Sequence, residues 1–261
     1  MFLLPVSCRK SLVLTEDDLP TSDNSTSDID PKNEQDDVSS FTGSYNIAIT
    51  YSGTSASVVI TDTLGNTLQA IDSLSITISG AGVTVNNLGH STIHYTLSGS
   101  STAGFFKLYS PSRQEIELSD LTLTGSNGAA INNQSDKRTY IVLTGSNTIK
   151  DGGSYSSTPA DEDERAAFFS EGQICVSGTG SLSITASAAD GKGGLFSDDY
   201  IRFLEGTVTV NASKGHAIRG KDAVIVSDGT VKANCTADHR IFLRGCANSP
   251  FFIIFVKMFS A

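Results

Sequence analysis

The sequence predicts an all-β protein, and within that class a right-handed parallel β-helix (a β-solenoid of short coils) over residues 41–238. Composition is the first indication, because 24 glycines, only 6 prolines and runs rich in Ser, Thr, Val and Ile are typical of short strands joined by turns. The second is the period of two in Leu74, Ile76 and Ile78, which a half-buried strand requires. The third is self-similarity in the later half of the chain, at a spacing typical of a β-solenoid.

That self-similarity joins three segments, residues 166–187, 193–213 and 216–236. Each has a short apolar start, a polar turn, a strand, a glycine-containing turn and a second strand, and the first strands are offset by 27 and then 23 residues. Stacking buries an apolar face that one unit cannot bury alone. We therefore expect two apolar ladders, one of Ile174, Ile201 and Val224 and one of Val176, Phe203 and Val226. An antiparallel sandwich, which also uses short alternating strands, is the alternative.

The two ends of the chain differ from this central region. Residues 1–8 are similar to the end of a bacterial lipoprotein signal, in which a short apolar run leads to the lipidated cysteine, here Cys8. Residues 9–40 are predicted to form an acidic disordered tether, because they hold many acids and few hydrophobic residues. An ordinary N-terminus with a chance cysteine is the alternative. Residues 239–261 are expected to be an irregular last coil or a truncated end.

The overall charge restricts the partners. The formal net charge of −10 leaves no visible basic face for phosphates, so we do not expect nucleic acid as a partner. An acidic surface suits neutral glycans or anionic glycans bridged by a divalent cation, and it also serves solubility alone. The four cysteines show no CxxC spacing, which argues against a zinc site. We expect a monomer that meets a membrane only through a lipid anchor at Cys8.

Alignment of the three segments suggests a calcium site at one corner. Glu171, Asp198 and Lys221 share one turn position, and Gly172, Asp199 and Asp222 share the next. Stacking would bring these acids to neighbouring rungs, and converging carboxylates are hard oxygen ligands that suit Ca²⁺. The predicted metal ligands are therefore Asp190, Asp198, Asp199 and Asp222. The alternative is a solvated turn in which Asp199 and Asp222 cap backbone N–H groups.

Basic and aromatic residues near the same corner are the predicted ligand-binding residues: Lys192, Tyr200, Arg219 and Lys221. Beside calcium, the bases could hold uronate carboxylates, and Tyr200 could stack on a pyranose ring. The same three bases are candidates for proton abstraction in a calcium-assisted elimination. Surface bases that balance neighbouring acids are the alternative. No catalytic residue is assigned.

Several strings resemble the bacterial β-helical carbohydrate-binding domain family: the segment 95–152, the string GGLFSDDYIRF (193–203) and the string HAIRGKDAVIVSDGTV (216–231). The resemblance covers roughly residues 90–236. It implies an exported, calcium-containing parallel β-helix, structurally close to pectate lyases, that binds cellulose or pectin-like polygalacturonate without established catalysis. His216 and Ala217 stand where the family's turn has an acid before Gly-Ile, which puts any site using that acid in doubt.

The leading hypothesis is thus a non-catalytic, calcium-stabilised protein that binds plant-type or acidic polysaccharides. It would be exported and held at the outer membrane or cell surface as a lipoprotein, or otherwise secreted. Two alternatives stay open. One is a calcium-dependent pectate-lyase-like enzyme, and the other is a structural adhesin with a β-helix stalk and a binding loop at residues 151–165.

Overall fold

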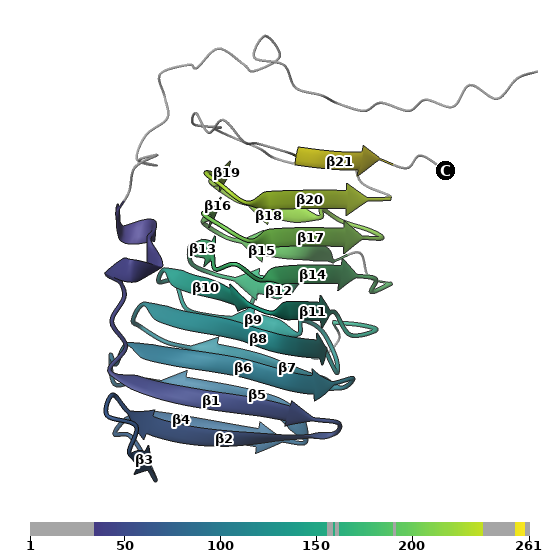
Figure 1. Cartoon of the computed structure of the whole chain (residues 1–261). Helices are drawn as coiled ribbons and strands as arrows, with labels where there is room; N and C mark the ends of the chain where they lie inside the picture. The colour runs from purple at the N-terminus through teal and green to yellow at the C-terminus, as the bar shows by residue number, and fades with distance from the viewer. Residues whose placement is uncertain (1–33, 156–158, 160–161, 190–191, 237–253, 259–261) are drawn as a thin grey trace, which may run out of the picture.

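The computed structural model of the chain describes residues 34–155, 159, 162–189, 192–236 and 254–258. The described chain begins with two short 3₁₀ helices, η2 (Glu34–Asp36) and η3 (Val38–Ser40), and is otherwise built of strands. Figure 1 shows these strands stacked in two layers. The all-β class predicted from composition and alternation is therefore confirmed.

The larger layer, sheet A, has 14 strands in the described part of the chain. Its main path runs in the order β19-β16-β13-β10-β8-β11-β14-β17-β20-β21, with β1, β2, β3 and β6 attached beside it. Its strands are β1 (Tyr45–Ser52), β2 (Ser55–Asp62), β3 (Thr67–Leu68), β6 (Ile93–Ser101), β8 (Gln114–Thr124), β10 (Thr139–Thr144), β11 (Ser146–Lys150), β13 (Ile174–Ser177), β14 (Ser181–Ala186), β16 (Tyr200–Phe203), β17 (Thr207–Ala212), β19 (Ala223–Val226), β20 (Thr230–Cys235) and β21 (Ile254–Met258).

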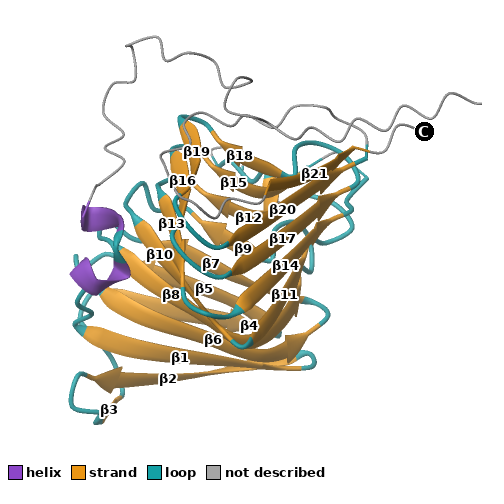
Figure 2. Cartoon of the chain, turned by 45° about the horizontal axis from the view of Figure 1, so that its top comes forward, coloured by secondary structure: helices purple, strands orange, loops and turns teal. Residues whose placement is uncertain are grey.

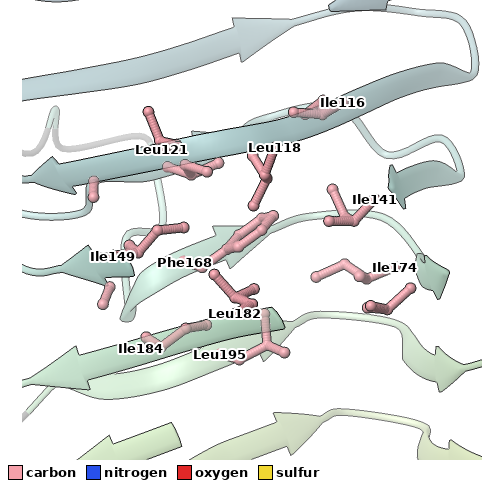
Figure 3. Close-up of a cluster of buried hydrophobic side chains, with 14 of the residues drawn as sticks. Ile116, Leu118, Leu121, Ile141, Ile149, Phe168, Ile174, Leu182, Ile184 and Leu195 are labelled. Carbon is pink, nitrogen blue, oxygen red and sulfur yellow. The ribbon is translucent and has the colours of Figure 1, made fainter. Parts of the chain in front are cut away.

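The smaller layer, sheet B, has seven strands among the described residues, in the order β18-β15-β12-β9-β7-β5-β4. Its strands are β4 (Leu74–Ser79), β5 (Ala81–Asn87), β7 (Gly104–Tyr109), β9 (Ile131–Asn133), β12 (Ala166–Ser170), β15 (Gly193–Ser197) and β18 (Ile218–Gly220). Both sheets contribute to one apolar core, because alternate residues of their strands point to the same interior. Figure 3 shows part of it, with Leu118 of sheet A and Phe168 of sheet B directed toward one another.

The predicted right-handed parallel β-helix over residues 41–238 is wrong. Both sheets are mixed: β1 pairs antiparallel with β2, β2 with β3, and β4 with β5, and neither sheet closes on itself. The reason lies in the turns. Only Gly53 and Thr54 separate β1 from β2, and only Gly80 separates β4 from β5, with both glycines in the left-handed region. Connections this short can join only antiparallel neighbours. The two facing mixed sheets are closer to a sandwich.

The predicted register of the later strands is confirmed. Ile174 of β13 pairs in parallel with Ile201 of β16, which pairs with Val224 of β19. These three side chains are at most 2% exposed and belong to the shared core. The second ladder, Val176, Phe203 and Val226, is formed in the same way.

Glycine bends divide each later stretch of sheet A into two short strands. Gly206, between β16 and β17, has a φ of +87°, and a Cβ there would lie 2.7 Å from the carbonyl oxygen of Gly178. Gly229 repeats this between β19 and β20, where a Cβ would lie 2.6 Å from the carbonyl oxygen of Gly206. A side chain is thus excluded by both conformation and space. These are the glycine-containing turns of the sequence repeats.

At the two ends, the structure describes only part of the predicted segments. Residues 34–40 of the predicted tether form η2 and η3, while Cys8 and the rest of that segment lie outside the described residues. In the C-terminal segment, β21 adds to sheet A in parallel with β20. Within the described part, no helix has the length and apolar character needed to cross a bilayer.

Candidate functional site at the turns after sheet B

The turn row consists of Glu171, Asp198 and Lys221, which directly follow β12, β15 and β18. Those strands are parallel and in register, so the three residues stand on successive rungs. Their backbones continue the ladder: Asp198 N donates to the Ser170 carbonyl at 3.0 Å, and Lys221 N donates to the Ser197 carbonyl at 3.0 Å. The equivalence of the turns inferred from sequence thus corresponds to adjacency in space.

Buried polar side chains hold these turns in place. Ser170 and Ser197 both donate to the carbonyl oxygen of Gly172 at 2.9 Å, and Asn133 donates to Ser170 Oγ at 2.9 Å. All three side chains are at most 1% exposed. Because a buried hydroxyl or amide needs a partner, this network fixes the turn backbone and hence the positions of the acids above it.

Three carboxylates meet above this network. Asp163, Glu171 and Asp198 each offer an oxygen, and these oxygens lie within 4.8 Å of one another. Arg165 pairs with Asp163 and, at 3.3 Å, with Asp198. Burial raises the pKa of Glu171, and the charges of Asp198 and Asp163 raise it further. We call Asp163, Glu171 and Asp198 the turn cluster; it carries more negative charge than Arg165 alone neutralises.

The loop before β12 supplies Asp163 and Arg165 to the turn cluster. Within the predicted binding loop at 151–165, Glu162 and Asp163 lie against sheet B. Glu162 contacts both Lys107 and Tyr109 of β7, and the Asp163 carbonyl accepts a hydrogen bond from Gln134 at 2.8 Å. The acid-rich run before β12 was the sequence signal for these residues, but it does not say which strand the loop would cover.

The next turn position behaves differently from the turn cluster. The Asp199 carboxylate accepts hydrogen bonds from its neighbour's backbone, Tyr200 N, at 2.8 Å and from the side chain of Gln173. Asp222 is exposed, and its backbone N donates to the Asp199 carbonyl at 3.2 Å. Burial raises the pKa of Asp199, and the charge of Asp222 adds to the effect. This arrangement has the hydrogen bonds expected of a capped turn.

The predicted ligand-binding residues are distributed around this corner. The Arg219 guanidinium lies 5.9 Å from the centre of the Phe196 ring, which also packs against His216. The ammonium of Lys192 lies 5.3 Å from the ring centre of Tyr155. Lys221 is exposed and acts electrostatically on Glu171. Asp190 lies outside the described residues.

Tyr200 occupies a different environment from the other predicted residues. It is 7% exposed, and its hydroxyl donates to Asp36 at 2.5 Å and accepts from Arg138 at 2.9 Å. Its ring therefore has no open face in this structure on which a sugar could stack. The sequence gives no sign of this cover, because Asp36 lies in the segment predicted to be a disordered tether.

Comparison with known proteins gives two matches. A family model described as "Carbohydrate-binding domain-containing protein" matches residues 76–240. The solved structure of a polysaccharide lyase-like protein from C. thermocellum, a gadolinium derivative, is similar with a TM-score of 0.60 and 20% identity, covering 81% of this chain and 79% of that chain. At that identity the similarity concerns the fold alone. No curated protein matches the chain significantly.

Proposed function

The chain belongs to the family of carbohydrate-binding domain-containing proteins, and we propose that it is a non-catalytic protein that binds acidic polysaccharides through calcium held at the turn cluster. The family match supports a polysaccharide as the ligand. The observation that carries the finer proposal is the meeting of Asp163, Glu171 and Asp198 within 4.8 Å beside basic residues, of which Lys221 is exposed. Acids and bases that alternate along one corner suit a ligand that bears carboxylates itself.

Calcium fits the donor set. Carboxylate oxygens are the ligands that Ca²⁺ prefers, and it takes six to eight of them in flexible geometry. Arg165 pairs with Asp163 and Asp198 but not with Glu171. A divalent cation would offset both the burial and the repulsion that raise the pKa of Glu171. The ion would supply a positive charge that both the protein and a uronate carboxylate can share. The remaining ligands would come from solvent or from the glycan.

The neighbouring side chains would orient the sugar. Arg219 and Lys221 lie on the rung beside Asp198, where they can hold a uronate carboxylate, Arg219 in a bidentate manner. The Phe196 ring beneath Arg219 keeps the guanidinium in place through a cation–π contact at 5.9 Å. Lys192 is held in the same way over Tyr155. We further propose export, with the chain anchored at the cell surface by a lipid on Cys8.

The test compares wild type with the double variant Glu171→Gln and Asp198→Asn. Wild type should bind polygalacturonate in calcium and lose binding in EDTA, and calcium should raise its melting temperature because only the folded chain presents the cluster. The double variant should lose the calcium-induced rise and bind polygalacturonate about tenfold or more weakly. Binding and melting measured in calcium and in EDTA give both readouts.

A matched control removes two acids elsewhere. Glu205 and Asp228 are exposed and lie at the bends of sheet A, so Glu205→Gln with Asp228→Asn changes the net charge equally. This control should keep the calcium response. Calcium-independent melting and binding of the wild type would contradict the metal site. Release of an unsaturated uronate product during the same assay would favour the lyase alternative, with Lys192, Arg219 or Lys221 as the base.

A further inference from the structure

The outer face of sheet A carries a second charged cluster that the proposed function does not use. Tyr140 of β10, Cys175 of β13 and Arg202 of β16 are register partners on that face. Their sequence neighbours Ile141, Ile174 and Ile201 face the core, so these three side chains point away from it. They are nonetheless at most 2% exposed. Something must therefore cover them.

The cover is the segment that contains η2, η3 and Phe41, which lies along this side of the molecule in Figures 1 and 2. Asp36 of this segment is 1% exposed. Its carboxylate lies 2.9 Å from Arg138 Nε and 2.5 Å from Arg202 Nε, and it accepts the Tyr200 hydroxyl at 2.5 Å. The Cys175 thiol is 3.5 Å away. We call Arg138, Tyr200 and Arg202 the carboxylate receptor.

The segment is attached to the sheet by side chains. Its backbone hydrogen bonds in the described chain run within the segment, from Asp37 to Glu34, from Ser40 to Asp37 and from Phe41 to Val38. The attachment includes the Asp36 contacts, the Tyr140 hydroxyl on the Gln35 carbonyl at 2.6 Å, the Arg138 guanidinium on Gln35 Oε1 at 3.2 Å, and the packing of Phe41 on the Tyr140 ring. The segment can therefore lift without breaking a strand ladder.

The receptor requires an anion. Arg202 is buried and the Arg138 side chain is 11% exposed. Two guanidinium groups so placed on one face repel each other and are costly to desolvate unless a negative charge lies between them. Asp36 fills this role incompletely. Its Oδ1 lies 2.9 Å from Arg138 Nε and its Oδ2 lies 2.5 Å from Arg202 Nε, yet among the described residues neither Arg138 Nε nor Asp36 Oδ2 forms a hydrogen bond of good geometry. A carboxylate that is free to adjust its position could also align with the Nε–H donor of Arg138.

We propose that the receptor is a second glycan site, filled by Asp36 in the absence of ligand, and that the carboxylate of a uronic acid replaces Asp36 when residues 34–41 lift. Lifting also uncovers the rings of Tyr140 and Tyr200, which supply flat faces for a sugar. The inference rests on the proposed function for the choice of a glycan. The two sites adjoin, because Asp198 of the turn cluster and Tyr200 of the receptor are separated only by Asp199, so one extended polysaccharide chain could reach both.

The test uses the full chain with Asp36→Ala, assayed in EDTA so that calcium-dependent binding does not contribute. Removing the competing carboxylate should strengthen binding of oligogalacturonate by about tenfold or more, since a masked site binds more weakly in proportion to the fraction that is open. Acetate and oligogalacturonate should each raise the melting temperature of the variant but not of wild type. Neutral cello-oligosaccharides should do neither.

Glu34→Ala is the matched control, because Glu34 is an exposed acid of the same 3₁₀ helix and should leave binding unchanged. Asp36→Ala combined with Arg202→Leu should lose the gain. If Asp36→Ala does not fold, Asp36→Asn keeps the shape and removes the charge, and the same gain is expected. If acetate but not oligogalacturonate raises the melting temperature of Asp36→Ala, the receptor is only a small-anion pocket, and the glycan site is overturned. Unchanged binding in both variants would overturn it as well, whereas the calcium-dependent binding of wild type would still report on the turn cluster.

Discussion

The two charged clusters of this protein have opposite imbalances. At the receptor, the single carboxylate of Asp36 lies between two arginines and is fully buried. At the turn cluster, three half-buried carboxylates meet, and Arg165 pairs with two of them, Asp163 and Asp198. The first arrangement lacks negative charge and the second lacks positive charge. The receptor is therefore suited to bind an anion and the turn cluster to bind a cation. The electrostatic energies involved are larger at the more deeply buried cluster.

The largest expected effect comes from breaking the buried cluster. Asp36→Ala leaves Arg138 and Arg202 buried without their shared carboxylate, and removing one partner of a buried ion pair costs about 3–5 kcal/mol. Urea denaturation would measure this loss. Combining it with Arg202→Leu should return part of the stability, because a buried charge is removed. Glu34→Ala should change the unfolding free energy by less than about 0.5 kcal/mol. An equally stable Asp36→Ala would show that the carboxylate is not a stabilising partner.

At the turn cluster, removing a carboxylate should have the opposite effect and raise the stability of the protein. Glu171→Gln should stabilise the calcium-free protein by about 0.5 kcal/mol, because it removes a partly buried charge and its repulsion from Asp198 and Asp163. The pKa of Glu171 is raised in the folded state, so folding takes up protons there. Stability should then fall as pH rises from the ordinary glutamate pKa of about 4.3 through the folded value. Melting curves over that window should show this fall in wild type and a smaller fall in Glu171→Gln.

The sequence predicted one of these clusters better than the other. Asp198, Lys221 and Glu171 were aligned correctly because each follows a strand of a repeated unit, and repetition is visible within one chain segment. Their partner Asp163 was missed because its loop folds back over sheet B through contacts with Lys107 and Tyr109, which no local pattern encodes. Asp36 was missed because its acidic surroundings have the composition of a disordered segment, whereas a few specific contacts over 100 residues away hold it in place.

The fold shows the same division. Alternation and repetition were enough to predict the all-β class and the stacking of Ile174, Ile201 and Val224. They could not separate a wholly parallel arrangement from mixed sheets, because strand direction depends on the length of each connection. The short turns at Gly53 and Gly80 make the N-terminal pairs antiparallel. The prediction missed them because it extended the pattern of the later repeats to the N-terminal strands.

The smallest effect is expected where the charged groups are partly exposed to solvent, on the outer face of sheet A at His94. Its Nδ1 lies 2.8 Å from Glu115 and its Nε2 lies 3.3 Å from Glu117, and the side chain is 26% exposed. The hydrogen bond with Glu115 raises the pKa of His94 against the opposing effect of burial, and Glu117 raises it further.

Because the folded pKa of His94 is raised, its contribution is fully present below the unfolded value of about 6.5 and is lost as pH rises through the folded value. His94→Gln keeps a hydrogen-bonding side chain but cannot titrate, so its unfolding free energy should lack this decline. The difference should be a few tenths of a kcal/mol, as for other partly exposed ion pairs, and should shrink in high salt. If wild type and His94→Gln lose stability in parallel across that window, then His94 is not charged between its two glutamates. His94 would then differ from the arginines of the receptor in being uncharged as well as in being more exposed.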